Sequence, residues 1–153
     1  MRWQPDRRDV LWPAALLGAG LAAAVDEIVF HQILAWHHFY DRATTSVGLF
    51  SDGVLHAVEL VAVVAGGYLL ADRHRRGALR ARPAWSGILL GAGAFQLFDG
   101  IVDHKLLRVH QIRYGVDLLP YDIAWAVVSL ALIAAGLLLR RGSVRGSRAP
   151  APR

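Results

Sequence analysis

The sequence contains no cysteine, and its single methionine is Met1. Without cysteine the chain can form neither a disulfide framework nor a thiolate metal site. With no methionine beyond Met1 it also offers no thioether ligand to a soft metal ion. Any metal site in this chain must therefore be built from histidine and carboxylate side chains.

Apolar residues dominate the composition, at 55% of the 153 residues. A membrane-spanning helix needs about 20 mostly apolar residues. Four segments meet that requirement, at roughly residues 11 to 36, 47 to 71, 85 to 108 and 121 to 139. We therefore predict an all-α integral membrane four-helix bundle. It would comprise an N-terminus over residues 1–10, a transmembrane domain over 11–140 and a disordered basic tail over 141–153.

The basic residues indicate how the chain is oriented. Of 17 Lys and Arg, most lie near the N-terminus, between the second and third apolar segments, or in the C-terminal tail. By the positive-inside rule both termini and the middle loop are cytoplasmic, which predicts a multi-pass membrane topology. Membrane topology also explains the pI of about 10.4, so we do not expect a nucleic-acid partner.

Two segments of the chain resemble each other. Residues 18–38 and 91–111 share the pattern D-x-I-V-x-H-x-x-L-x-x-H at a constant offset of 73. This predicts a parallel two-helix repeat whose pseudo-two-fold axis follows the membrane normal. The first apolar segment could instead be a signal peptide, but a cleaved leader has no reason to match an internal helix.

Longer motifs resemble a known family. They read DEIVFHQILAWHH, SDGVLH, FQLFDGIVDHKLLRVHQIRY and YDIAW, and they extend over most of residues 11–140. In these motifs the chain resembles the bacterial membrane proteins grouped as domain of unknown function two-two-four-three. The resemblance implies a small four-helix protein of the bacterial plasma (inner) membrane and assigns no activity to it.

Acids and histidines inside apolar helices predict a functional site, because ionisable groups at membrane depth are costly. On helical spacing, His31, His56 and His104 lie at one depth in the outer half of the bundle. They are the central candidate ligands for one or two transition-metal ions, with Zn, Fe, Mn and Cu unresolved. The other candidates, as ligands or as acceptors that orient the imidazoles, are Glu27, Glu59, Asp26, Asp99, Asp52, His110 and His37. For His37, solvation at the membrane interface is the simpler interpretation.

Other interpretations of the same residues stay open. His31 and His104 could be the axial ligands of a bis-histidine haem, although a porphyrin needs an apolar slot. The acids and histidines could form a proton or cation relay of a transporter, or could only hydrogen-bond the helices together. The lipid bilayer is the expected partner beside the metal ion. The sequence does not decide enzymatic activity or homodimer formation.

Overall fold

The computed structural model of the chain describes residues 8–146, and every regular element in that range is helical. The elements are α1 (Arg8–Asp26), η1 (Glu27–Ile33), α2 (Thr45–Arg75), α3 (Ala81–Phe98), η2 (Asp99–Leu106) and α4 (Leu119–Gly146). Here η marks a π-helix that continues the preceding α-helix. Four spans are long and apolar enough to cross a membrane, namely Val10–Ile33, Thr45–Arg75, Ala81–Leu106 and Leu119–Arg141. The predicted all-α fold with four spans is confirmed.

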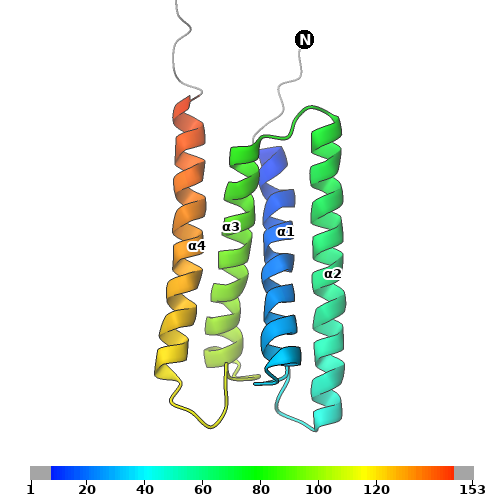
Figure 1. Cartoon of the computed structure of the whole chain (residues 1–153), viewed down its shortest axis with the longest axis vertical. Coiled ribbons are helices and arrows are strands. Elements are labelled where there is room, and N and C mark those ends of the chain that lie inside the picture. Colours follow the sequence, from blue (N-terminus) through cyan, green and yellow to red (C-terminus); the bar gives the residue numbers. More distant parts are fainter. Residues whose placement is uncertain (1–7, 147–153) are drawn as a thin grey trace, which may run out of the picture.

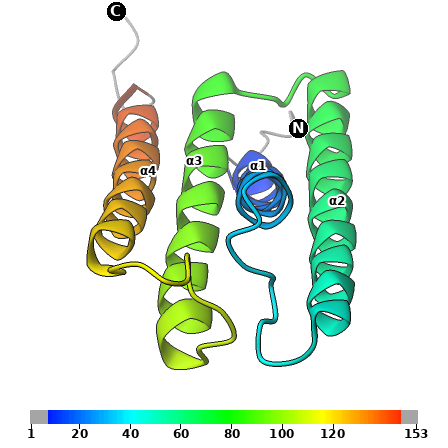
Figure 2. The same ribbon diagram turned by 60° about the horizontal axis from the view of Figure 1, so that its bottom comes forward.

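The four helices lie side by side in the order α4, α3, α1, α2 (Figure 1). The central helices α1 and α3 run parallel, and each outer helix runs antiparallel to its neighbour (Figure 1). Within residues 8–146 no contact joins α2 with α4, so the bundle is open. The connections 34–44 and 107–118 lie together at the end away from both termini (Figure 2).

Two glycines allow α1 and α3 to pack backbone against backbone. A Cβ at Gly18 would lie 2.0 Å from the carbonyl oxygen of Ile88, and one at Gly91 would lie 1.9 Å from that of Ala15. No side chain fits at either position, so the helices approach as closely as glycine permits. The two contacts are related by the offset of 73, since Ala15 corresponds to Ile88 and Gly18 to Gly91.

The outer helices pack on the central ones through a second pair of glycines. A Cβ at Gly66 in α2 would lie 2.6 Å from the backbone nitrogen of Leu17, and one at Gly136 in α4 would lie 2.7 Å from the side chain of Leu90. The two contacts correspond to each other, since Gly66 matches Gly136 at an offset of 70 and Leu17 matches Leu90 at an offset of 73. They are the contacts that a parallel repeat requires, while the repeat itself stays a prediction from the sequence.

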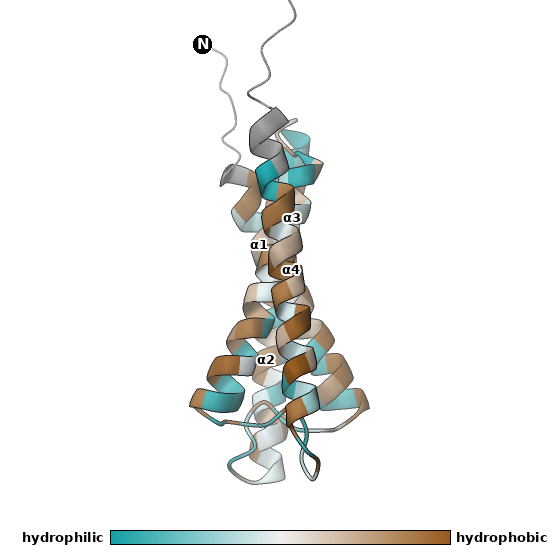
Figure 3. Cartoon of the chain, turned by 90° about the vertical axis from the view of Figure 1, so that its left-hand side faces the viewer, coloured by the Kyte–Doolittle hydropathy of each residue, from teal (hydrophilic) through white to brown (hydrophobic). Residues whose placement is uncertain are grey.

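Apolar residues dominate the middle of the helices, and hydrophilic residues gather toward the two ends (Figure 3). Large side chains of α2 such as Val58, Val61 and Tyr68 are more than half exposed, as expected of a surface that faces lipid. Helix α4 continues to Gly146, six residues into the segment 141–153 that was expected to be disordered. The rest of that expected tail and residues 1–7 of the expected N-terminal segment lie outside the described residues.

Candidate metal centre

The candidate site begins where α1 and α3 change into π-helix. With i→i+5 hydrogen bonding, residues five apart stack on one face, whereas in an α-helix they would lie about 140° apart. The π-helix η1 therefore places Asp26 beside His31, with an Oδ2–Nε2 distance of 3.6 Å. In η2 Asp99 lies beside His104 in the same way, with an Oδ2–Nε2 distance of 3.1 Å. Single π-helical turns are frequent at functional sites.

Beyond each π-helix the chain turns back toward the bundle. Ala35 and Arg108 adopt positive φ angles of 46° and 52°, which is uncommon for residues other than glycine. The two residues are again separated by 73 positions. These turns end the helices at Ile33 and Leu106, so the expectation that they continue to about residues 36 and 108 is corrected. As a result His37 and His110 fold inward and do not continue outward from the helix ends.

The two loop histidines are held by each other's loop. The Nδ1 of His37 lies 3.0 Å from the carbonyl oxygen of Ile112, and the Nδ1 of His110 lies 2.8 Å from that of Phe39. Because a carbonyl oxygen can only accept, Nδ1 carries the hydrogen in both rings and Nε2 keeps its lone pair. This arrangement is the usual way in which proteins orient metal-binding histidines.

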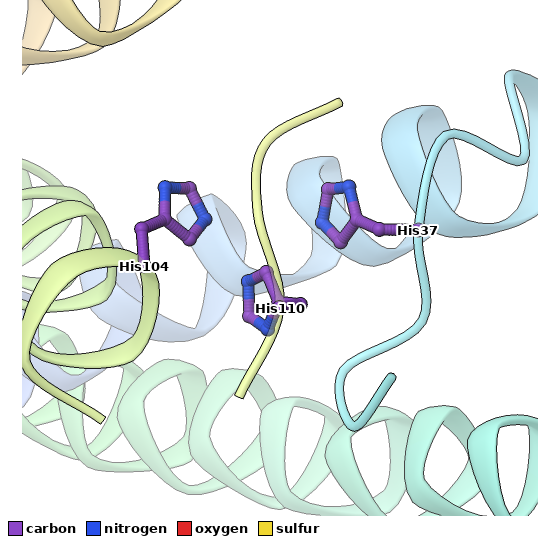
Figure 4. A group of neighbouring side chains, drawn as sticks. All are labelled: His37, His104 and His110. Atoms are coloured by element: carbon purple, nitrogen blue, oxygen red, sulfur yellow. The ribbon is translucent and has the colours of Figure 1, made fainter. Parts of the chain in front are cut away.

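Three imidazoles converge at the centre of the site (Figure 4), and they come from η2 and from both loops. One ligand atom each from His37, His104 and His110 lies within 4.8 Å of the others. The Nε2 atoms of all three are buried, with no hydrogen-bond partner among residues 8–146. Ligands of one ion with bonds of about 2.1 Å lie about 3.4 Å apart at tetrahedral angles, so the ligand atoms of this group must approach one another by up to about 1.4 Å to bind one ion.

Asp99 lies directly beside this group. Its Oδ2 is 3.1 Å from His104 Nε2, and its Oδ1 is 3.4 Å from His110 Nε2. The residue is only 3% exposed. Neither Asp99 Oδ2 nor His104 Nε2 has an aligned hydrogen-bond partner in the described part of the chain. A carboxylate and two imidazoles therefore face the same point without donating to one another.

A second group of ligands lies on the side of His31 that faces α2. The Nδ1 of His31 is 2.7 Å from Glu27 Oε2 and 3.3 Å from Asp52 Oδ1. Asp52 is held in place by the Nδ1 of His38 at 2.6 Å and by the backbone N–H of Phe39 at 2.7 Å. The Nε2 of His31 faces the opposite way, toward Asp26. Asp26, His31 and His37 form a third group that could hold an ion.

Burial and neighbouring charges set the protonation of the two loop histidines. Burial, followed by the nearby rings of His31, His110 and His104, lowers the pKa of His37 to about 2. His37 is therefore a neutral ring at any ordinary pH. Burial by itself would lower the pKa of His110, but the carboxylate of Asp99 and the carbonyl oxygen of Phe39 outweigh it and raise that pKa.

The site buries four carboxyl groups without a buried lysine or arginine beside them. Asp26, Glu27, Asp52 and Asp99 are between 2% and 4% exposed. No lysine or arginine is buried among residues 10–141. Charges removed from water need a partner of opposite sign, since an uncompensated one costs several kcal/mol. The arrangement suits one or more metal cations.

The structure separates the candidate ligands into two sets. His31, His37, His104, His110, Asp26, Glu27, Asp52 and Asp99 come together at the polar end. His56 does not join them, because its side chain is 57% exposed and its Nδ1 lies 2.6 Å from Glu59 Oε1. Glu59 is buried, with its Oε2 unpartnered within the described segment. The expectation that His37 is solvated is corrected, since His37 is only 5% exposed.

The helical spacing misplaced His37 because it continued the helix past the turn at Ala35. The accepting carbonyl oxygens of Phe39 and Ile112 escaped the sequence analysis altogether, since backbone oxygens have no signature in the sequence. The equal spacing of His37 and His110 within the repeat was the available signal that both belong to one site.

A family profile described as "Predicted membrane protein (DUF2243)" matches residues 13–143 of the chain. No curated protein and no solved structure matches the chain.

Proposed function

The chain belongs to this family of predicted membrane proteins, and we propose that it binds a transition-metal ion through His37, His104 and His110 at the polar end of the membrane domain. Asp99 supplies a fourth ligand or balances the charge of the ion. The role is metal handling or redox chemistry close to one membrane surface.

The proposal depends chiefly on the free Nε2 atoms of His37 and His110. Their Nδ1 atoms donate to backbone carbonyls, so each Nε2 lone pair needs either a hydrogen-bond donor or a metal ion. Both Nε2 atoms are buried without a hydrogen-bond partner in the described range. A buried polar atom left unsatisfied costs about 1–3 kcal/mol. One ion that binds these atoms together with His104 Nε2 would satisfy all three.

The ligand types restrict the choice of metal. Imidazole suits Zn, Cu, Fe and Ni, whereas sites made mostly of oxygen suit Mg, Ca and Mn. Three histidines and one carboxylate therefore favour Zn, Cu or Fe over Mn among the candidate ions. The absence of sulfur ligands in the sequence disfavours a dedicated Cu(I) site.

The surroundings favour an ion over a haem. A porphyrin requires an apolar slot between its axial ligands. Here carboxylate oxygens lie 2.7 Å from His31 and 3.1 Å from His104, the two expected axial ligands. The rings of His104 and His110 are also only 4.6 Å apart. These close polar neighbours suit a small cation.

A relay across the membrane has less support. The acids and histidines of the spans Val10–Ile33 and Ala81–Leu106 extend no deeper than Asp26 and Asp99, and beyond these two residues α1 and α3 pack through Gly18 and Gly91 against backbone atoms. That contact leaves no space for a side chain or for a file of water between these two helices. The site is therefore better suited to holding an ion at one membrane surface.

The test is elemental analysis with an absorption spectrum on the full chain purified in detergent. We expect stoichiometric metal and no Soret band. His104→Ala combined with His110→Ala should abolish metal retention, while His74→Ala at the opposite end of α2 should retain it. A Soret band would show that the site binds haem instead of a metal ion. Equal metal content in the double variant and in His74→Ala would overturn the proposed ligands.

A further inference from the structure

We propose that His31 bridges two metal ions as an imidazolate, with its Nε2 on the central ion and its Nδ1 on a second ion held by Glu27 and Asp52. This inference rests on the proposed function and adds a second site to it. It makes the centre dinuclear, with the second ion on the α2 side of the bundle.

Both nitrogen atoms of His31 are available for bonding. The side chain of His31 is completely buried, and neither ring nitrogen has a hydrogen-bond partner within residues 8–146. A neutral imidazole carries one N–H, which in a buried site requires an acceptor. His37 and His110 meet that requirement with backbone carbonyls. The carboxylate oxygens beside His31, at 2.7 Å to 3.6 Å from its ring nitrogens, are not aligned to accept a hydrogen bond from them. An imidazolate between two ions has no N–H to satisfy.

Each nitrogen of His31 faces a different group of ligands. Nδ1 lies 2.7 Å from Glu27 Oε2 and 3.3 Å from Asp52 Oδ1. Ligands of one ion with bonds of about 2.1 Å lie about 2.9–3.4 Å apart at octahedral or tetrahedral angles. Nε2 faces Asp26 Oδ2, and the rings of His31 and His37 have centroids 4.4 Å apart. The two ions would therefore lie on opposite edges of one ring, about 6 Å apart from the same bond lengths.

The other half of the chain indicates what Asp52 lacks. At an offset of 70 Asp52 corresponds to Asp122, whose Oδ2 lies 2.7 Å from the ammonium group of Lys105. At an offset of 73 Lys105 corresponds to Gln32, which is neutral and donates to Glu27 instead. Asp122 thus has a lysine as its cation. Asp52 and Glu27 have only histidine and amide partners, so a metal ion is the cation that this side lacks.

The binding step balances without any redox change. The second ion forms bonds to His31 Nδ1, Glu27 and Asp52, and the single N–H proton of the His31 ring is released to solvent. Two divalent ions then stand against one imidazolate and the carboxylates of Asp26, Glu27, Asp52 and Asp99. The net charge of the centre would be −1, whereas the same four carboxylates without metal would carry −4.

The test uses Cu(II) as a probe, since sites of imidazole and carboxylate suit this ion. Metal-free full chain in detergent is titrated with Cu(II), bound copper is counted, and the low-temperature EPR signal is integrated. Two Cu(II) ions bridged by imidazolate couple antiferromagnetically, so we expect two ions per chain and a signal far below the copper content. Asp52→Asn should bind one ion with a full signal. The matched control Asp122→Asn should behave like the unaltered chain.

Each other result overturns the bridge. One ion per chain with a full signal would support the central site and show that no second ion binds. Two ions with a full signal would show two sites that His31 does not join. No bound copper at all would overturn the proposed function together with the bridge. Because the unaltered chain alone distinguishes these results, a variant that fails to fold does not prevent a decision.

Discussion

The rings of His37 and His110 stack with centroids 4.6 Å apart and an interplanar angle of 6°. Each ring donates to the carbonyl oxygen of the residue two positions beyond the other histidine, at Ile112 and at Phe39. The two loops therefore hold each other in a reciprocal contact. It presents two Nε2 lone pairs side by side, one from each half of the chain.

His37 and His110 should act as a unit in metal binding. We expect His37→Ala and His110→Ala each to weaken binding by more than the 10–100-fold typical of a lost outer partner. The double variant should lose little more, because both residues would serve one ion. Competition with a chelator measures the affinities. His56→Ala is the control and should bind normally, since its ring is exposed and paired with Glu59. Additive losses would indicate two separate sites.

Metal affinity should rise with pH. Metal binding requires neutral imidazoles, and the pKa of His110 is raised while that of His37 is lowered to about 2. Of the two rings, His110 is therefore the one whose protonation competes with the metal as the pH falls. Affinity should fall as the pH drops through the raised pKa of His110 and level off above it. Chelator competition between about pH 5 and 8 tests this, because the unperturbed pKa of histidine lies near 6.5. A flat profile would contradict a role for His110 as ligand.

Removal of the metal should destabilise the polar end of the protein. An ion that binds only the folded state at 100 times its dissociation constant adds about 2.7 kcal/mol to the free energy of unfolding. Treatment with a chelator should lower the midpoint of thermal unfolding in detergent, and added metal should restore it. In His104→Ala/His110→Ala the chelator should have no effect. A chelator effect of equal size in that variant would show that the stabilising ion binds elsewhere.

The close packing of α1 on α3 should make Gly91 intolerant of substitution. A Cβ there would lie 1.9 Å from the carbonyl oxygen of Ala15, so Gly91→Ala must separate the helices and should cost about 1–3 kcal/mol or more. Gly67→Ala in α2 is the matched control, because apart from its chain neighbours and its own helix backbone no described atom lies within 4 Å of a Cβ there. That control should stabilise the helix by about 0.5–1 kcal/mol. Thermal unfolding in detergent compares the two, and equal effects would contradict the packing.

The spans were predictable because a membrane imposes a simple requirement on composition. The expected segment 121–139 lies inside the span Leu119–Arg141, and 47–71 lies inside Thr45–Arg75. The ends of α1 and α3 were less predictable. An α-helical spacing separates Asp26 from His31, and only the π-helical turn brings them to 3.6 Å. The α-helical spacing used for the sequence contained no sign of this change to i→i+5 hydrogen bonding.

The sequence predicted which polar residues could form a site, but it did not predict how their side chains are arranged. Glu27, His31 and Asp52 stood out as ionisable groups in apolar helices, and the structure brings them together. His56 stood out equally, but it projects outward, because α2 is an outer helix that contacts only the α1–η1 segment among the described elements. The order of helices in space decided which face of α2 met the site.

The sequence by itself determined that this chain is all-helical, that it has four spans, and that any metal site must use nitrogen and oxygen ligands. Hydropathy and the absence of cysteine are sufficient for those conclusions. Only the tertiary structure decided that His37 and His110 face inward. Their orientation depends on carbonyl oxygens contributed by the opposite loop, across 75 and 71 residues of chain. Such partners become neighbours only when α1 and α3 are packed together.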